Sequence, residues 1–332
     1  MWPPIAIETF SRETNGMTQI VRAAAAIVAL AFIAYPTFAE GPLREVERII
    51  PSISVIRPTA TVVFGGDMLF DRTIRGTMEE KGQDYIFLCL DPVFSAADLV
   101  VANLEGPITE LPSMSLGSVI GSPENFTFTF PTYTGELLAR HNVQLVNLGN
   151  NHILNFGWDG ARSTLEYLRA ADVGYFGDPL EKRVAREDVN GVKLAFVNYN
   201  EFAPGGWKDS ASTTIREVRA AQDDGYVPVV YAHWGDEYSA EPPERVREFA
   251  RAFVDAGAAL VVGSHPHVVQ MHEVYRGRHI YYSVGNLFFD QYWNDLVRNG
   301  LLLRASFTGS GVSVEEIPIE LLRTRQTCPI AS

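Results

Sequence analysis

The sequence predicts an α/β protein with a functional site at the carboxyl ends of its strands. Apolar runs rich in β-branched residues alternate with segments of helical period, which is typical of parallel strands joined by crossover helices. One such run, at 261–264, is followed by two histidines, His265 and His267, on either side of Pro266. At least four other apolar runs also end in Asp, Glu, Asn or His.

Composition narrows the classes of function. A chain of 332 residues is long enough for one large α/β domain or two small ones. Forty acidic against 27 basic residues give a net charge of −13, which argues against a non-specific nucleic-acid or anionic-membrane binder. The only two cysteines, Cys89 and Cys328, lack the spacing of a zinc knuckle or a redox motif. One long-range disulfide in an oxidising compartment remains open to them.

The amino-terminal segment resembles an export signal. Residues 23–35 form an apolar run of 13 residues preceded by Arg22, and residues 37–39 resemble a small-residue cleavage site. This run is too short to span a bilayer comfortably. We therefore interpret 1–39 as a signal peptide, with an uncleaved anchor as the alternative and Met17 as the start that gives the best signal order. The expected location is the periplasm or the cell surface.

The rest of the chain is predicted to form one domain. No internal repeat or low-complexity segment interrupts it, and no strong change of composition divides it after residue 60. The predicted boundaries are a lead-in linker at 40–59, the domain at 60–322 and a tail at 323–332.

Three predicted strands in the first half of the domain lead into polar residues. They are 60–64, which runs into Asp67; 99–102, which runs into Asn103 and Glu105; and 143–148, which runs into Asn151 and His152. A Pro/Ser/Gly-rich loop is expected at 111–125, close to Glu105. A helix is expected at 158–170, where apolar residues recur on one face.

A strand, helix, strand unit carries the histidines of the second half. The strand 227–232 ends at His233, and the helix 242–257 leads into the strand 259–262. Such a unit forms a right-handed parallel crossover. His233 and His265 should therefore lie at the same edge of one sheet, which is where α/β sheets place their sites.

The segments around this unit complete the expected fold. Before it, a strand at 194–198 leads into a Gly/Pro/Ser loop at 201–214. After it, His265 precedes a proline and is expected to be extended, which points His265 and His267 to the same side. The tail should be an antiparallel meander without helices. Its expected strands are 268–274, 279–284, 301–307 and 312–319.

The strand-end residues suit a transition-metal site. Their mixture of carboxylate, amide oxygen and imidazole fits Zn²⁺, Mn²⁺ or Fe and does not fit Ca²⁺. We predict one or two divalent ions; two ions about 3.5–4 Å apart would position a nucleophile and neutralise a phosphate. A histidine beside them that is not a ligand would protonate the leaving group.

Several of these residues also have an ordinary structural explanation. Asp67 follows two glycines and could form a turn, and Asn151 could cap its loop. Glu105 and Glu237 could be solvated loop charges, although we favour function for both. The histidines that match no motif are expected to be structural or surface residues. These are His141, His272 and His279.

Six short motifs occur in order between residues 60 and 292. They are GGDMLFDR from Gly65, NLEG from Asn103, GNNH from Gly149, HWGDEY from His233, GSHPHV from Gly263 and YSVGN from Tyr282. Together they resemble the calcineurin-like metallophosphoesterase superfamily and, within it, the CapA family of bacterial capsule and poly-γ-glutamate synthesis proteins. The resemblance implies a metallophosphoesterase-like four-layer α/β/β/α sandwich.

The resemblance also implies roles for individual residues. The implied metal ligands are Asp67 and His267 for one ion, and Asn151, His233 and His265 for the other, with Glu105 where a bridging Asp is usual. His152 falls at the position of the general acid. Leu69 stands where the superfamily has a ligand histidine, so Asp71 or Asn103 substitutes for it or a single ion binds. The CapA family generally lacks this histidine.

The implied function is that of an exported protein in the biosynthesis or export of a poly-γ-glutamate capsule or related surface polymer. We expect a metal-dependent hydrolase whose ligand is an anionic polymer or a phosphorylated small substrate, with membrane-bound capsule synthesis partners and no nucleic acid. Arg72, Asn103 and Glu237 are the predicted substrate-binding residues, although Arg72 could instead pair with Asp71. The alternatives are a metal-dependent phosphoesterase on an exported substrate, and a non-catalytic polymer-handling protein whose metal is structural.

Overall fold

A computed structural model describes residues 58–181 and 183–330, which belong to one compact unit. The predicted signal peptide or anchor at 1–39 and almost all of the predicted linker at 40–59 lie outside the described residues. Within the described part of the chain, no helix combines the length and the apolar character needed to cross a membrane.

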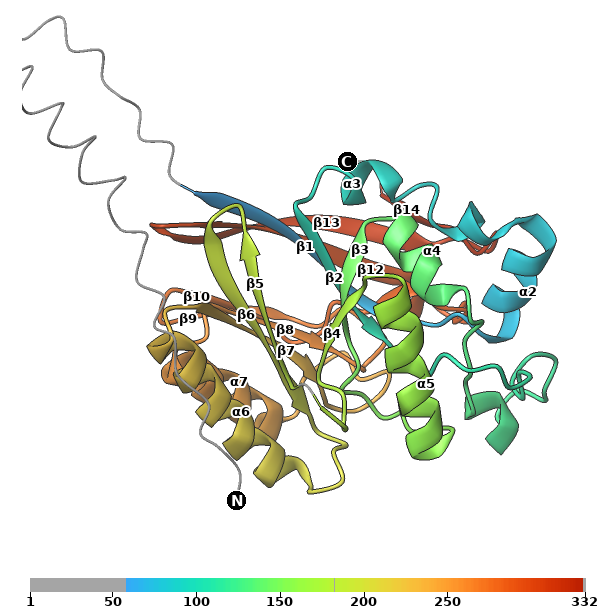
Figure 1. The fold of residues 1–332 in the computed structure, drawn as a ribbon, viewed down its shortest axis with the longest axis horizontal. Coiled ribbons are helices and arrows are strands. Elements are labelled where there is room, and N and C mark those ends of the chain that lie inside the picture. Colours follow the sequence, from blue (N-terminus) through green and yellow to red (C-terminus); the bar gives the residue numbers. More distant parts are fainter. Residues whose placement is uncertain (1–57, 182, 331–332) are drawn as a thin grey trace, which may run out of the picture. The chain divides into compact units, whose positions relative to one another are not determined.

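Two sheets dominate the described unit (Figure 1). The first has eight strands in the order β14-β13-β12-β1-β2-β3-β4, with β11 paired to β1. Its strands are β1 (Thr59–Met68), β2 (Leu99–Leu104), β3 (Val143–Asn147), β4 (Gly174–Phe176), β11 (Asn286–Phe288), β12 (Asn299–Thr308), β13 (Gly311–Leu321) and β14 (Thr327–Pro329). The second has six strands in the order β5-β6-β7-β8-β10-β9. These are β5 (Val184–Val189), β6 (Val192–Asn200), β7 (Val227–His233), β8 (Leu260–Ser264), β9 (His272–Tyr275) and β10 (Arg278–Tyr281).

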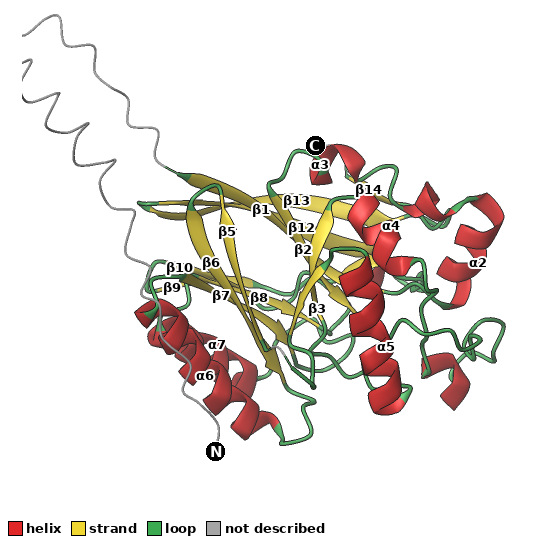
Figure 2. Ribbon diagram, in the orientation of Figure 1, coloured by secondary structure: helices red, strands yellow, loops and turns green. Residues whose placement is uncertain are grey.

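Helices cover the outer faces of both sheets (Figure 2). Those on the side of the first sheet are α2 (Arg72–Lys81), α3 (Asp91–Phe94), α4 (Thr134–Arg140) and α5 (Gly157–Ala170). The second sheet packs against α6 (Trp207–Asp223) and α7 (Glu244–Ala256). The short elements are α8 (Asp295–Arg298) and the 3₁₀ turns η2 (Gln83–Ile86) and η3 (Pro123–Phe126).

The apolar core follows the alternation of side chains along the strands. In β1, Val62 and Phe64 enter the cluster between the sheets, where the ring of Phe64 lies 6.2 Å from the ring of Phe196 in β6. Val63, between them, enters the cluster beneath the helices of the first sheet. A strand buried on both faces in this way needs an almost continuous apolar run. The four-layer α/β/β/α sandwich predicted above is therefore confirmed.

The register of the parallel strands places polar residues in two rows at the sheet edges. The row in the first sheet is Asn286, Asp67, Asn103 and Asn147, and the row in the second sheet is Asn200, His233 and Ser264. Neighbouring residues of a row are register partners on adjacent strands. The predicted alignment of strand ends is thus confirmed within each sheet.

Three predicted segments differ from the structure. The loop expected at 201–214 extends only to Gly206, because α6 begins at Trp207. The tail is not one meander: β9 and β10 join the second sheet, β12 to β14 join the first, and the short helix α8 lies between them. The tail predicted at 323–332 also contains β14, which pairs with β13.

The two cysteines form the long-range disulfide that the sequence left open. Cys89 lies before α3 and Cys328 lies in β14, with Cα atoms 4.9 Å apart and a sequence separation of 239 residues. The bond attaches the last strand of the first sheet to the segment that precedes β2.

Candidate metal centre

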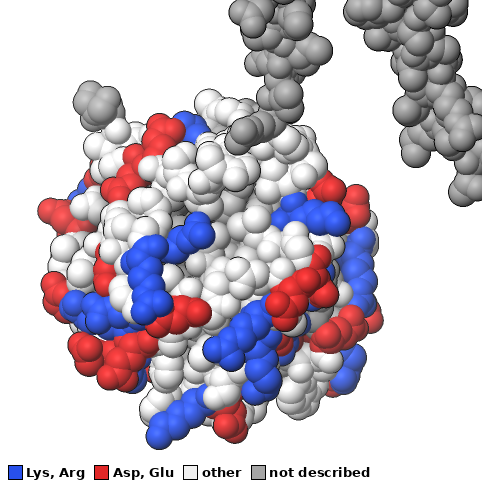
Figure 3. All heavy atoms as spheres, turned by 90° about the vertical axis from the view of Figure 1, so that its left-hand side faces the viewer, with Lys and Arg blue, Asp and Glu red and all other residues white. Residues whose placement is uncertain are grey.

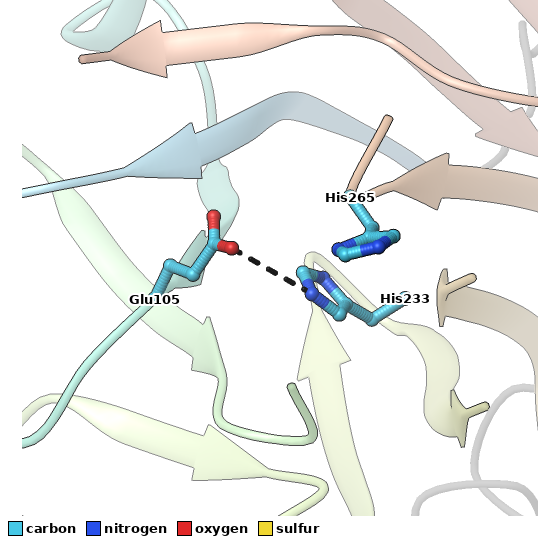
Figure 4. Close-up of side chains that lie close together, drawn as sticks. All are labelled: Glu105, His233 and His265. Carbon is cyan, nitrogen blue, oxygen red and sulfur yellow. Dashed lines mark ion pairs between the residues drawn. The ribbon is translucent and has the colours of Figure 1, made fainter. Parts of the chain in front are cut away.

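Two groups of potential metal ligands share Glu105 at the ends of the strands. One consists of Glu105, His233 and His265, and the other of Asp67, Glu105 and His267; within each group the ligand atoms lie within 4.8 Å of one another. All five side chains are buried. Figure 4 shows Glu105, which follows β2, facing the rings of His233 and His265, which come from the ends of β7 and β8.

Asp67 is the most strongly supported carboxylate of the centre. Asn103 Nδ2 donates to its Oδ1 at 2.8 Å, and the backbone N–H of His265 donates to its Oδ2 at 3.0 Å. Burial alone would raise its pKa, but the hydrogen bond and charge of His267, the charge of His233 and the His265 amide outweigh burial and lower the pKa to about 2. Asp67 is therefore a fixed anion.

Glu105 is buried without such support. Both of its carboxylate oxygens lack a hydrogen-bond partner among the described residues, although Oε1 lies 3.7 Å from His233 Nε2 and 3.8 Å from His267 Nε2. Burial, and then the negative charge of Asp67, raise the pKa of Glu105 well above its ordinary value. A buried carboxylate in this state is destabilising unless a cation neutralises it.

Burial favours the neutral form of two of these histidines, His233 and His265. Burial, followed by the charges of neighbouring histidines, lowers the pKa of His233 well below its ordinary value and that of His265 to about 3. His265 Nδ1 is buried and has no hydrogen-bond partner in the described part of the chain. Neutral imidazole nitrogens beside carboxylate oxygens form the donor set of a borderline divalent metal. The orphaned atoms of Glu105 and His265 therefore fit the predicted ion.

His233 contacts the residue predicted to share its ion. Its Nε2 lies 2.8 Å from Asn151 Oδ1, while its Nδ1 lies 3.0 Å from Ser264 Oγ and 3.3 Å from Asn103 Nδ2. Asn151 and His233 thus present their ligand atoms side by side. The structure brings all six predicted metal-ligating residues to this one place.

The backbone of the His-Pro-His segment differs from the prediction. His265 has φ 97° and His267 has φ 57°, so neither is extended. The strand β8 ends at Ser264, and the segment that follows contacts the first sheet through the hydrogen bond from the His265 N–H to Asp67, before β9 and β10 continue the second sheet. Left-handed backbone is uncommon for residues with a side chain and costs about 1–3 kcal/mol per residue. This turn directs the two rings to different groups, 6.1 Å apart between centroids.

Asparagines that the sequence did not single out as functional support the ligands. His267 Nδ1 lies 2.8 Å from Asn286 Oδ1, which leaves Nε2 towards Glu105. On the other side, Asn198 Nδ2 donates to Asn147 Oδ1, and Asn147 Nδ2 donates to Asn103 Oδ1, both at 2.9 Å. The signal for them was present: Asn286 ends the YSVGN motif, and the others close apolar runs.

His152, the predicted general acid, lies beside the centre in an apolar setting. Its Nδ1 lies 3.0 Å from Asn155 Oδ1, and its ring centroid is 4.3 Å from that of Phe128. Burial lowers its pKa to about 4, more than the Asn155 hydrogen bond raises it. Because no carboxylate of the described residues is hydrogen-bonded to it, His152 is a neutral ring.

The three predicted substrate-binding residues differ in burial and in their contacts. Asn103 is fully buried and its amide holds Asp67, so the structure gives it a positioning role in place of a substrate contact. Glu237 is exposed, and its charge contributes to the raised pKa of Glu105. Arg72 does not pair with Asp71; it pairs with Asp290 at 2.7 Å.

Neither Leu69 nor Asp71 contributes to the centre. Leu69 is fully buried in the apolar cluster beneath the helices of the first sheet. The carboxylate of Asp71 accepts hydrogen bonds from Ser113 Oγ at 2.5 Å and from the Thr129 N–H at 2.8 Å, and it pairs with Arg75. Asp71 therefore fixes the loop at 111–131 and does not substitute for the missing histidine.

Fold and site together define an α/β sandwich protein with a buried histidine and carboxylate centre. The chain belongs to the bacterial capsule synthesis protein PGA_cap family, which matches residues 61–291. This range contains every ligand described above, and the resemblance noted in the sequence is confirmed.

Known relatives and solved structures are similar to the chain over most of its length. It is 31% identical to the PGA biosynthesis protein CapA of Bacillus subtilis, covering 78% of this chain and 70% of that protein. It is 26% identical to the capsule biosynthesis protein CapA of Bacillus anthracis, covering 87% and 74%. Among solved structures, TT1561 of Thermus thermophilus aligns with a TM-score of 0.43 and 11% identity, over 74% of this chain and 94% of that one.

Proposed function

We propose that this protein acts in the synthesis or export of a poly-γ-glutamate capsule or related surface polymer, through a divalent-metal centre that hydrolyses its substrate. The observation that carries the proposal is Glu105: a buried carboxylate with both oxygens unpartnered among the described residues, shared by two groups of ligands. The family, and the capsule and PGA biosynthesis for which the two Bacillus relatives are named, support the biological setting.

The residues divide into two sets around Glu105. Asp67 and His267 would hold one ion, and His233, His265 and Asn151 would hold the other, with Mn, Zn or Fe as the metal. When bound, such an ion supplies Lewis acidity towards a phosphoryl or carbonyl oxygen. The ordered hydrogen bonds to Asp67 and His267 keep these ligands in place before substrate arrives.

We assign to Arg72 the role of receiving an anionic group beside its ion pair with Asp290. Its guanidinium lies between two aromatic rings, 5.1 Å from the centroid of Phe128 and 5.2 Å from that of Phe289. The same rings pack on His152 and His267. Its backbone has φ 49°, a conformation that residues with a side chain seldom adopt. Such strain accompanies residues whose position matters for function.

The role of His152 would be to give a proton to the leaving group, which requires that a bound anionic substrate raise the pKa of His152 from about 4 and so protonate the ring. Its ring lies on Phe128, as the Arg72 guanidinium does, so the proton donor and the anion-binding cation share one wall of the site. A phosphorylated substrate and an anionic polymer would both be oriented by this pair. The alternative function, a metal-dependent phosphoesterase on an exported substrate, would use the same residues in the same roles.

Leu69 favours a second candidate, a non-catalytic polymer-handling protein with a structural metal. Because this position is apolar and buried, the group containing Asp67 has one ligand fewer than the superfamily pattern. In that case the ion would stabilise the fold and His152 would have no chemical role.

Two features bear on the setting of the protein. A disulfide is typical of oxidising compartments, which supports the proposed export. On the face shown in Figure 3, Lys and Arg alternate with Asp and Glu and form no patch of one sign among the described residues. Because the chain has a net charge of −13, an anionic polymer would be held locally, by Arg72 and the metal centre. Membrane-bound capsule synthesis proteins are the proposed partners.

The test combines metal analysis with hydrolysis. We expect one or two transition-metal ions per chain in protein purified without chelator, and Mn²⁺-dependent hydrolysis of a generic phosphodiester. Glu105→Gln should lose most of the metal, whereas Glu110→Gln, an exposed carboxylate hydrogen-bonded to Tyr167, should keep it. Equal metal content in the two variants would refute the centre.

His152→Ala separates the two candidate functions. A hydrolase should lose about 10²–10⁴-fold in turnover with metal content and melting temperature unchanged, since general acids contribute that much. A protein with a structural metal should show no turnover before or after the change. His279→Ala, in β10 and in neither ligand group, is the matched control.

A further inference from the structure

A cavity of about 450 Å³ adjoins the metal centre on the side of α6. It lies between the segment that precedes α5, the end of β6 and the first turns of α6. Two of its lining residues also belong to the surroundings of the centre: Asn151, which contacts His233 at 2.8 Å, and Phe202, whose ring lies 4.4 Å from that of His265. A ligand in the cavity would therefore reach the centre past Asn151 and Phe202.

The cavity walls contain polar atoms that nothing in the described structure satisfies. Ser210 is 5% exposed and its Oγ has no hydrogen-bond partner among the described residues; the same holds for Oδ1 of Asn198, which is fully buried. Buried polar atoms of native proteins are nearly always paired. Two such atoms on the lining of one cavity point to a ligand that pairs with them.

A cation and two aromatic rings complete the lining. Arg183 uses Nε to pair with Glu217 at 3.1 Å, and its Nη2 is buried without a partner in the described chain. Trp158 and Phe202 are 48% and 42% exposed, which is high for large apolar side chains. The amino terminus of α6, preceded by Gly205 and Gly206, opens onto the cavity without a side-chain cap.

We propose that this cavity binds a carboxylate-bearing amide segment, such as consecutive glutamyl units of a polymer, and delivers it to the metal centre. The carboxylate would accept hydrogen bonds from Arg183 Nη2 and Ser210 Oγ, and an amide N–H would donate to Asn198 Oδ1. The size fits, because ligand cavities of about 300–1,000 Å³ are usual. The inference rests on the proposed function for the identity of the polymer.

The charge of the cavity favours a carboxylate over a phosphate. Arg183 is already half-neutralised by Glu217, and the exposed carboxylate of Asp209 also lines the cavity. A phosphate places two negative charges on one group and has no N–H for the acceptor Asn198 Oδ1, whereas a glutamyl segment carries one carboxylate per unit beside an amide and uses both the donors and the acceptor of the walls. A neutral sugar could stack on Trp158 but would leave Arg183 unused.

The test is calorimetric titration of the full chain with a pentamer of γ-linked glutamate. We expect Arg183→Met, which keeps the apolar stem, to weaken binding by about tenfold or more, as for loss of a charge-assisted hydrogen bond. Ser210→Ala should weaken it about three- to tenfold, and because its hydroxyl has no partner among the described residues the variant should keep the melting temperature. Arg186→Met is the matched control, since this arginine pairs with Asp224 outside the cavity.

Three results would overturn the proposal: equal affinities for the Arg183 and Arg186 variants, no binding of the pentamer by the wild-type chain, or tighter binding of glycerol phosphate or cellopentaose than of the pentamer. The proposed hydrolytic centre is judged separately, by the metal content of Glu105→Gln. A chain that binds metal but not the pentamer keeps the centre and loses the cavity inference. A chain that binds the pentamer but no metal keeps the cavity inference and loses the metal centre.

Discussion

The chain places histidines close together in two regions, and only one of them has the properties of a metal site. At the outer edge of the second sheet, His272 Nε2 lies 2.8 Å from His279 Nδ1. This outer pair stacks on Tyr281, and His272 is within 3.8 Å of Glu316. His272 Nε2 and His279 Nδ1 are hydrogen-bonded to each other. Among the described residues, no group of three potential metal ligands forms at this edge.

The metal centre differs in what it leaves unsatisfied. Its five carboxylate and histidine ligands are buried, whereas the side chain of His272 is 30% exposed. Orphaned oxygens of Glu105 and an orphaned nitrogen of His265 remain in a setting where water cannot compensate them. The comparison teaches that proximity of histidines identifies a metal site less well than buried ligand atoms without partners.

Replacing one histidine in each region should give the largest contrast. His233→Ala removes a ligand and should lower metal affinity by more than about 100-fold, the upper range for residues that only support ligands. His272→Ala should leave metal content unchanged. Elemental analysis after dialysis against a metal buffer measures both, and similar metal loss in the two variants would show that the regions do not differ as described.

Loss of the disulfide should lower the global stability of the protein without changing the metal content of the centre. Cys328→Ser opens a bond that links residues 239 apart in sequence, and removal of a native disulfide typically costs about 2–5 kcal/mol. Because Cys328 lies in β14, at the far edge of the first sheet from β2, metal content of the folded protein should not change. Denaturant unfolding with and without reductant measures the effect. Equal unfolding midpoints in both conditions would contradict it.

Replacing Asn286 tests how much the hydrogen bond that orients His267 contributes to metal affinity. Its Oδ1 lies 2.8 Å from His267 Nδ1, while its Nδ2 donates to Gln291 Oε1 and to the backbone oxygen of Val297, both at 3.0 Å. Asn286→Leu should lower metal affinity about 10–100-fold, the usual effect of losing an outer hydrogen bond. Competition with a chelator measures the affinity. An unchanged affinity would mean that packing alone orients His267.

The sequence predicted the composition of the centre better than its geometry. Polar residues that close apolar runs are visible in the sequence, and parallel topology brings strand ends to one edge, so Asp67, Glu105 and His233 could be placed together. The turn at His265 could not, because the preference of residues before proline for extended backbone is local, whereas the hydrogen bond between the His265 N–H and Asp67 of the first sheet is a tertiary contact.

Helix α6 was missed for a different reason. Its buried face includes Ser210, Ala211 and Thr214, which are small or polar and give no apolar period, and the Gly/Pro segment before it has the composition of a loop. Of these three residues, Ser210 lines the cavity beside the centre. The hydrogen-bonding role of Asn286 depends on the register between β1 and β11, which no local pattern contains.

The outer histidine pair should have a small effect of its own, on the pH dependence of stability. Burial, and then the charge of His279, lower the pKa of His272 below its ordinary value of 6.5. The unfolded chain therefore binds this proton at a higher pH than the folded chain, so the free energy of unfolding falls as pH drops below 6.5 and is unaffected well above it. His279→Gln keeps a hydrogen-bonding group but removes the charge, and should reduce the loss of melting temperature between about pH 8 and about pH 5.5 by about 1–2 °C. Calorimetry of metal-loaded protein keeps the centre constant during this comparison. If the variant and the wild type lose the same amount, the pair is a neutral surface feature, and the acid sensitivity of the protein has to come from the buried histidines.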